Sequence, residues 1–167
     1  MLLVRRNTGR SIRRVAELLD EKLFKQPPPK EDCLICMIPL PTFHSGSKYY
    51  ECCGKIICSG CIHAVENTRN TKVPLCPFCR TPKAKDEDFV KQLKNRVDAN
   101  DPKAIYNLGC LYQQGSRGYP QDYSKAIKYW QEAGKAGVGD SEAYYNVGNA
   151  YMNGDGVQRD MKKAIHY

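Results

Sequence analysis

The sequence predicts two folds in one chain: a small cysteine-rich module followed by an all-α helical repeat. Two observations predict this division. Eight of the nine cysteines lie between Cys33 and Cys79, and the segment from residue 102 onward contains one pattern twice. A length of 167 residues allows one domain or two small ones. We therefore expect one module that depends on its cysteines and one that depends on helix packing.

The composition argues against a membrane-spanning or exported protein. No apolar run approaches the ~18 residues that a membrane span needs. The apolar start at residues 1–4 is shorter than the apolar core of a secretory signal. An intracellular location, cytoplasmic or nuclear, is therefore expected. In a reducing compartment, clustered thiols indicate metal ligands or catalytic groups more often than disulfides.

The basic excess of the chain lies mainly in a leader, residues 1–30. This leader holds eight Lys and Arg against three acidic residues, within a net charge of +8. Apolar residues three and four apart predict an amphipathic helix over 11–24, which the three prolines at 27–29 would end. Acidic residues inside this helix favour a weakly packed leader, with mitochondrial targeting or an anionic surface as alternatives. No aromatic residues alternate with the arginines, so nucleic-acid binding is not expected.

The second half of the chain repeats itself. Residues 104–109 return as 143–148, 39 residues later, and 122–126 return as 160–164, 38 residues later. Each unit has two helical halves joined by a glycine-rich turn. Small residues stand where two helices would approach closely, namely Gly109, Ala126, Gly148 and Ala164. Periods of this length are typical of helical solenoids.

A connecting helix is expected over residues 82–101, before the first repeat. Apolar residues recur there at helical spacing, and acidic residues stand at its start. Recurring aromatic residues in the following units are expected to form the repeat core and its groove: Tyr106, Tyr112, Trp130, Tyr144, Tyr145 and Tyr151. The isolated Cys110 is expected to be a small buried hydrophobe, because no His or acid accompanies it.

Residues 102–167 resemble the Sel-1-like repeat, a relative of the tetratricopeptide helix-turn-helix repeat. The motifs are Ala-x-x-Asn-Leu-Gly-x-x-Tyr at 104–112, the turn at 154–157 and Asp-x-x-Lys-Ala at 160–164. The turn at 115–120 departs from the family pattern and predicts a longer first turn. The resemblance implies a solenoid that holds other proteins, with repeats at 102–137 and 138–167.

Solenoid repeats are stabilised by contact with their neighbours, and about three are usually needed. The second repeat stops in mid-helix by the phase of the first. We therefore expect a fragment of a longer array, or another segment that covers the open face.

The clustered cysteines form four pairs, three with the C-x2-C spacing and one adjacent: Cys33/Cys36, Cys52/Cys53, Cys58/Cys61 and Cys76/Cys79. A tight turn lets two such thiolates bind one tetrahedral ion, so eight thiolates make two sites. Soft sulfur ligands favour zinc over magnesium or calcium. An iron–sulfur cluster is the metal alternative, but its cysteines usually have less regular spacing. Spacing alone leaves three ways to combine the four pairs into two sites: sequential, nested and interleaved.

Residues 32–81 resemble a RING finger. The resemblance rests on Cys-Gly-x-x-Ile-Cys-x-x-Cys-Ile at 53–62 and Cys-Pro-x-Cys-Arg at 76–80. It implies a small cross-braced α+β zinc finger over 31–81 with two structural Zn²⁺ ions and interleaved ligands. The implied ligands of the first zinc are Cys33, Cys36, Cys58 and Cys61, and those of the second are Cys52, Cys53, Cys76 and Cys79.

One position departs from the RING pattern. Lys55 stands where the family usually has a histidine ligand, and an ammonium cannot bind zinc. We expect Cys52 to substitute, which makes the finger an all-cysteine variant; His44 and His63 are the alternatives. Two adjacent ligands require a bend at this point, which Gly54 can relieve.

The RING resemblance implies a ubiquitin-protein ligase, a transferase that forms no covalent intermediate of its own. Such fingers hold a ubiquitin-loaded conjugating enzyme while a substrate lysine attacks the thioester. Ile35, Ile62 and Pro77 match the contact positions for the conjugating enzyme. Arg80 matches the linchpin, whose planar guanidinium hydrogen-bonds both that enzyme and ubiquitin. The repeats would then hold an unknown protein substrate.

The alternative is a non-catalytic zinc-binding scaffold for protein interactions, because the same apolar residues could simply shield the metal. In that case Arg80 would be a solvated surface residue.

Overall fold

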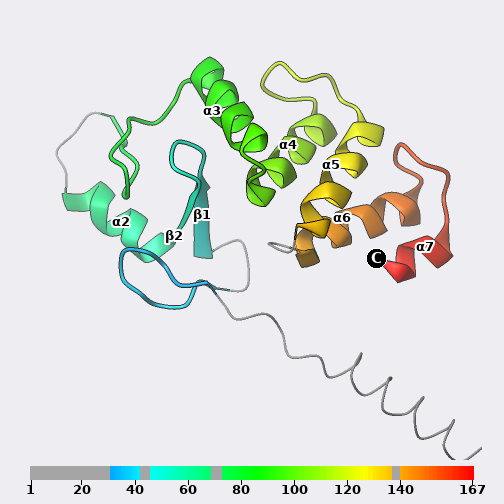
Figure 1. The fold of residues 1–167 in the computed structure, drawn as a ribbon, viewed down its shortest axis with the longest axis horizontal. Coiled ribbons are helices and arrows are strands. Elements are labelled where there is room, and N and C mark those ends of the chain that lie inside the picture. Colours follow the sequence, from blue (N-terminus) through cyan, green and yellow to red (C-terminus); the bar gives the residue numbers. More distant parts are fainter. Residues whose placement is uncertain (1–30, 42–45, 69–72, 137–139) are drawn as a thin grey trace, which may run out of the picture. The chain divides into compact units, whose positions relative to one another are not determined.

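The computed structural model describes residues 31–41, 46–68, 73–136 and 140–167, and the expected leader helix over 11–24 lies outside them. The described part contains one hairpin and a series of helices (Figure 1). Their bounds are β1 (Ser47–Tyr50), β2 (Lys55–Cys58), α2 (Ser59–Thr68), α3 (Asp86–Asp98), α4 (Pro102–Gln114), α5 (Tyr123–Lys135), α6 (Asp140–Asn153) and α7 (Met161–His166). None of these helices is long and apolar enough to cross a membrane.

The cysteine-rich segment has a small sheet and little apolar core. Strands β1 and β2 pair antiparallel, with Tyr49 opposite Ile56, and α2 follows β2 directly. The buried residues of its core cluster are Cys33, Leu40 and Ile57. A segment of this size with so few buried apolar side chains needs another source of stability.

The repeated aspartates are helix caps, which explains why they recur. Asp122 precedes α5 and accepts a hydrogen bond from the Lys125 amide. Asp160, 38 residues later, precedes α7 and accepts from the Lys162 and Lys163 amides. Each carboxylate satisfies donors that the first helical turn leaves unpaired. The segments 122–126 and 160–164 are therefore helix starts with the same local chemistry.

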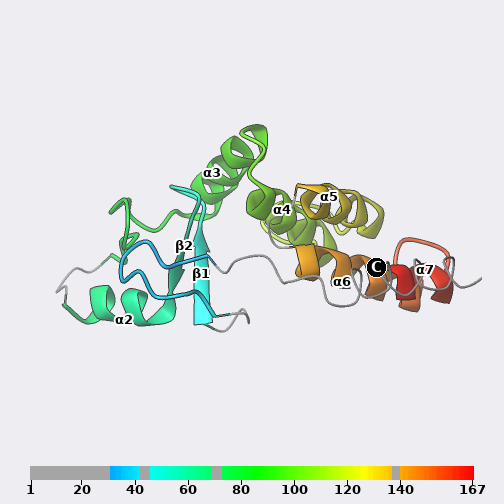
Figure 2. The same ribbon diagram turned by 60° about the horizontal axis from the view of Figure 1, so that its bottom comes forward.

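Small residues let the helices approach, as the sequence predicts. A Cβ placed on Gly109 would lie 2.8 Å from the Trp130 ring and 3.2 Å from the Ala126 carbonyl oxygen. A Cβ on Gly148 would lie 3.1 Å from the Ala164 carbonyl oxygen. Each helix from α4 to α7 packs against the one before it (Figure 2). The predicted helix-turn-helix repeat is confirmed.

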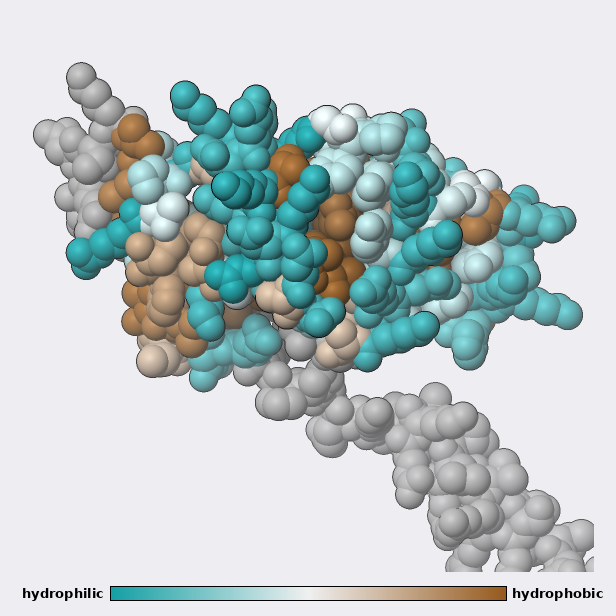
Figure 3. Space-filling model, turned by 45° about the horizontal axis from the view of Figure 1, so that its top comes forward, coloured by the Kyte–Doolittle hydropathy of each residue, from teal (hydrophilic) through white to brown (hydrophobic). Residues whose placement is uncertain are grey.

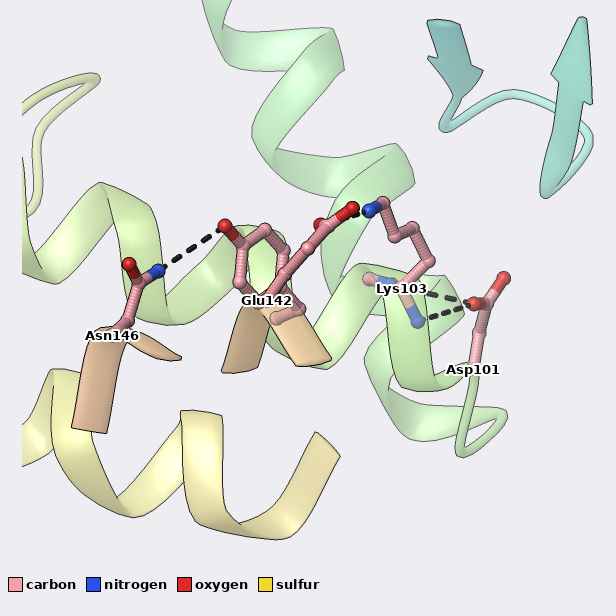
Figure 4. Close-up of polar contacts among 6 residues, drawn as sticks. Asp101, Lys103, Glu142 and Asn146 are labelled. Atoms are coloured by element: carbon pink, nitrogen blue, oxygen red, sulfur yellow. Dashed lines mark hydrogen bonds and ion pairs between the residues drawn. The ribbon is translucent and has the colours of Figure 1, made fainter. Parts of the chain in front are cut away.

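Polar contacts also join equivalent helices of the two repeats. Lys103 in α4 forms an ion pair with Glu142 in α6, with 2.6 Å between Nζ and Oε2 (Figure 4). The Asn146 amide of α6 donates a hydrogen bond to the Tyr106 hydroxyl of α4 at 3.1 Å. Lys103 and Glu142 occupy the same position of their repeats, 39 residues apart. The contacts therefore connect α4 directly to α6.

The hairpin and α3 pack against the first repeat. Tyr49 of β1 and Leu93 of α3 share a buried cluster with three residues of α4: Ala104, Leu108 and Leu111. Strand β1 therefore contributes to the core of the helical part, although it belongs to the cysteine-rich segment.

Candidate metal centre

The first cysteine cluster joins a loop to the start of a helix. Cys33 and Cys36 come from the loop before β1, Cys58 ends β2, and Cys61 lies in the first turn of α2. Their four sulfur atoms lie within 4.8 Å of one another. The Sγ atoms of Cys36 and Cys58 are 3.7 Å apart. The first cluster thus ties β2 and α2 to a loop that has no regular structure of its own.

The second cysteine cluster joins the hairpin turn to a later loop. Cys52 and Cys53 lie in the turn between β1 and β2, whereas Cys76 and Cys79 follow α2. These four sulfur atoms also lie within 4.8 Å of one another. The Cys53–Cys76 and Cys52–Cys79 Sγ distances are 3.8 Å and 3.4 Å. Along the chain the two clusters alternate, which is the interleaved combination among the three that spacing allows.

The two outer C-x2-C loops have the same backbone. In one, the Met37 amide donates to the Cys33 carbonyl and the Cys33 amide donates to the Ile38 carbonyl, at 2.8 and 2.9 Å. In the other, the Arg80 amide donates to the Cys76 carbonyl and the Cys76 amide donates to the Thr81 carbonyl, at 3.0 and 2.8 Å.

The residue after the second cysteine is left-handed in both loops, with φ of 57° at Met37 and 61° at Arg80. Two different stretches of sequence thus form the same turn, which presents a pair of thiols. We refer to these two loops, residues 33–38 and 76–81, as the knuckles.

The sulfur atoms of both clusters fit a tetrahedral ion. Zinc–sulfur bonds of about 2.3 Å in a tetrahedron place neighbouring sulfurs about 3.8 Å apart. The Sγ–Sγ distances of 3.4, 3.7 and 3.8 Å lie close to that value. Both clusters can therefore hold a metal ion with four thiolate ligands and no open position.

The pKa values show what crowding does to these thiols. Burial and the neighbouring Cys76 raise the pKa of Cys53 to about 11, despite a backbone hydrogen bond from Lys55. Burial and hydrogen bonds with other thiols raise the pKa of Cys61 to about 12. At Cys79, burial is outweighed by hydrogen bonds from Thr81 and Cys52, which lower the pKa to about 6. Four thiolates together would repel one another, and a divalent cation would remove that penalty.

The turn carrying Cys52 and Cys53 bends as the sequence predicts. The Cys53 and Gly54 amides both donate to the Tyr50 carbonyl, at 3.3 and 2.8 Å. Gly54 has a φ of 67°, in the left-handed region that glycine adopts without a steric penalty. The bend lets both adjacent cysteines reach one cluster.

The histidine alternatives do not join the second cluster in the described residues. His63 lies exposed in α2, where its ring contacts the Asn67 amide at 3.0 Å. His44 lies outside the described residues. The structure therefore brings Cys52, and not His63, to the other three thiols.

The residues expected to touch a conjugating enzyme lie on or beside the knuckles. Ile35 in the first knuckle is 41% exposed, and Pro77 in the second is half-buried. Arg80 is exposed directly after the last cysteine. Ile62 is half-buried and packs against the core cluster of the cysteine-rich segment. The structure therefore presents Ile35 and Arg80 openly and Ile62 only in part.

Sequence reasoning missed most of the apolar surface around the knuckles. Further exposed large apolar residues there are Leu34, Met37, Ile38, Val73 and Phe78. Figure 3 shows apolar surface gathered over the cysteine-rich segment and a second apolar strip in the middle of this face, while the rest of the face is largely hydrophilic. The available signal was the placement of Leu34 and Phe78 between the cysteines of their pairs, where a short loop cannot bury them.

The Sel1 repeat family model matches residues 102–138 and 141–167. These two segments are Sel1 repeats. Helices α4 and α5 lie in the first Sel1 repeat, and α6 and α7 lie in the second.

Among solved structures, the Sel1 repeat protein from Oxalobacter formigenes is 34% identical. The match covers 52% of this chain and 34% of that one, with a TM-score of 0.46. Helicobacter pylori cysteine rich protein B is 21% identical, with coverages of 64% and 68% and a TM-score of 0.44.

Two curated plant proteins match parts of the chain. The E3 ubiquitin-protein ligase DA2 of Arabidopsis thaliana is 29% identical over 75 residues, which is 40% of this chain and 18% of DA2. The ERAD-associated E3 ubiquitin-protein ligase component HRD3B of the same plant is 25% identical over 107 residues, with coverages of 47% and 18%. The chain thus spans less than a fifth of the length of either relative.

Proposed function

We propose that this chain is a RING-type ubiquitin-protein ligase. In this proposal residues 31–81 bind two structural zinc ions and hold a ubiquitin-loaded conjugating enzyme, and the Sel1 repeats hold a protein partner. The observation that carries the proposal is the interleaved pair of four-thiol clusters whose knuckles present apolar side chains. Relatives named as E3 ubiquitin-protein ligases support the same function. The location expected for it is intracellular.

The zinc ions would have a structural role. Each cluster offers four thiol ligands, so no coordination position is left for water or substrate. The core cluster of this segment contains three buried residues and supplies little hydrophobic stabilisation. Metal binding would therefore provide much of the folding free energy of the finger and keep the knuckles in place.

The knuckles would form the surface that binds the conjugating enzyme. Ile35 and Phe78, from opposite ends of the segment, are 41% and 46% exposed. Apolar side chains of this size on short rigid loops are typical of protein interfaces. Arg80 follows directly and offers five N–H donors in a planar fork, enough for acceptors on two proteins. The finger would thus act by holding the ubiquitin-loaded conjugating enzyme in a reactive orientation.

A pocket beside the first Sel1 repeat is the candidate contact for the protein partner. It has a volume of about 440 Å³ and lies between the second cluster and α4. Lys83, Gln92, Asn107 and Arg117 contribute polar groups to its wall. Asn146, the equivalent of Asn107 in the second repeat, bonds to Tyr106, whereas no described residue hydrogen-bonds to the Asn107 amide. That amide is free to bind a peptide backbone of the partner.

An autoubiquitination assay with a panel of conjugating enzymes tests the ligase proposal. Activity is expected with at least one enzyme, and Ile35→Ala and Arg80→Ala should each abolish most of it. Ile165→Ala is the matched control, because Ile165 is 82% exposed on α7 and far from the knuckles in the sequence. Zinc content and circular dichroism should be unchanged in all three variants. A folded protein with two zinc ions and no activity would favour the non-catalytic scaffold.

A further inference from the structure

The turn that carries the adjacent cysteines is held by a helix outside the finger. Arg96 of α3 donates from Nε to the Glu51 carbonyl and from Nη2 to the Cys52 carbonyl, both at 3.3 Å. Arg96 is half-buried at this contact. One guanidinium therefore binds two successive peptide groups next to the second cluster.

The same hairpin is also bound to the start of the first Sel1 repeat. The Tyr49 hydroxyl donates to Asp101 Oδ2 at 2.6 Å. Asp101 Oδ1 accepts from the amides of Lys103 and Ala104, at 3.0 and 3.3 Å, and so caps α4 (Figure 4). Burial and the carboxylate both raise the pKa of Tyr49, which keeps its hydroxyl protonated as a donor. A single carboxylate thus starts the repeat and binds the finger.

Gly54 brings these two contacts together. A Cβ on Gly54 would lie 2.9 Å from Asp101 Oδ2 and 3.2 Å from Arg96 Nη1. The turn is therefore packed directly against both side chains. We call this contact the hairpin clamp, made by Tyr49, Glu51, Cys52, Gly54, Arg96 and Asp101.

The hairpin also occupies a position that a neighbouring repeat element would otherwise cover. Helix α3 precedes α4 as α5 precedes α6, and each carries one fully buried large residue, Leu93 and Trp130. Helix α4 has α6 on one side, through the Lys103–Glu142 ion pair. Towards the cysteine-rich segment it meets the Tyr49 ring, which packs with Leu93 and residues of α4. Solenoid repeats depend on such neighbours for their stability.

The first cluster lacks a comparable connection. No hydrogen bond or ion pair among the described residues joins the knuckle at 33–38 to any helix from α3 to α7. The two clusters therefore differ in how directly they contact the helical part.

We propose that the hairpin is the N-terminal cap of the Sel1 repeats, and that metal binding in the second cluster stabilises these repeats through Arg96 and Asp101. The proposal rests on the zinc sites of the proposed function but not on ligase activity. Coupling between binding equilibria is reciprocal, so the folded repeats must in turn raise the metal affinity of the second cluster. Arg96 is then a positioning residue for this cluster.

Zinc retention in the full-length chain tests the metal side of the coupling. Native mass spectrometry would count bound zinc against increasing chelator, and alkylation mapping would show which cysteines open first. Arg96→Ala should lower the zinc affinity of the second cluster by about 10- to 100-fold, the usual cost of losing an outer-shell contact, and leave the first unchanged. The zinc affinity of the second cluster in Arg96→Lys should lie between those of the wild type and Arg96→Ala, because one ammonium cannot bind both carbonyls in the same way. Lys94→Ala, at an exposed position of the same helix, is the matched control.

Hydrogen exchange in α4 tests the repeat side. Zinc removal should speed amide exchange in α4 of the wild type by about tenfold or more, and Arg96→Ala should speed it while both ions remain bound. Tyr49→Phe, which removes one hydroxyl, keeps the test available if Arg96→Ala does not fold, and should speed exchange less. Equal zinc retention in Arg96→Ala and wild type would overturn the proposal. An amide exchange rate in α4 that is the same with and without zinc would also overturn it. A wild type that binds no zinc would instead refute the proposed metal sites.

Discussion

The Tyr49 hydroxyl and the Asp101 carboxylate, 52 residues apart in the sequence, are joined by a hydrogen bond of 2.6 Å. Tyr49 belongs to the hairpin that contributes cysteines to both clusters, and Asp101 caps the first helix of the first Sel1 repeat. The cysteine-rich segment and the first Sel1 repeat are consequently joined through the Asp101 side chain.

Asp101→Ala should destabilise the chain more than the loss of a cap alone. Removing an N-cap costs about 1 kcal/mol, and breaking a hydrogen bond to a charged group costs about 1.5–3 kcal/mol more. Asp160→Ala is the control, because Asp160 caps α7 with the two equivalent amide contacts and, among the described residues, hydrogen-bonds none of the cysteine-rich segment.

Urea unfolding with a Tyr49→Phe and Asp101→Ala double-mutant cycle would measure the coupling between the two residues. Additive effects would show that the 2.6 Å contact contributes nothing to stability.

Gly54→Ala should be more destabilising than Gly118→Ala. Both glycines have positive φ, 67° and 83°, so both substitutions carry the cost of a left-handed alanine, about 1–2 kcal/mol. Gly54 faces Asp101 and Arg96 at close range, whereas a Cβ on Gly118 would meet nothing within 4 Å. The difference in free energy of unfolding between the two variants isolates the packing of the clamp. Equal costs would mean that the turn moves away freely.

Cys52→Ser should reduce the bound zinc from two ions to one, or to one plus a weakly held second. Cys52 completes the second cluster, and three thiols bind zinc less tightly than four. Native mass spectrometry checks the count, and Cys110→Ser should leave it at two because Cys110 lies outside both clusters. Two tightly held ions in Cys52→Ser would assign the fourth ligand to a histidine.

Gly109→Ala should destabilise the first Sel1 repeat, although alanine favours helices by about 1 kcal/mol over glycine. The added methyl group would lie 2.8 Å from the buried Trp130 ring, and overpacking of this kind costs about 1–3 kcal/mol. Thermal unfolding of the variant measures the balance. A higher melting temperature would show that Trp130 can shift to accept the methyl group.

The helical repeat was predictable from sequence because its signals are local. The cap at Asp160 accepts hydrogen bonds from amides two and three residues away. Gly109 lies at a close helix contact, and its place in the repeat pattern predicts that contact. The C-x2-C pairs could also be predicted from the sequence, since the spacing of each thiol pair is a local feature of four residues. The exposure of Phe78 was missed because apolar character alone does not say whether a loop is covered.

The sequence by itself determined that this chain has three C-x2-C pairs, an adjacent cysteine pair and two copies of a helix-turn-helix unit. Those features need only interactions between residues a few positions apart. The tertiary structure decided which thiol pairs meet, because the spacing of the cysteines permits three groupings of the pairs and only the packed structure selects the interleaved one. It also decided that Arg96 and Asp101 bind the hairpin, since a hydrogen bond across 44 or 52 residues leaves no periodicity in the sequence.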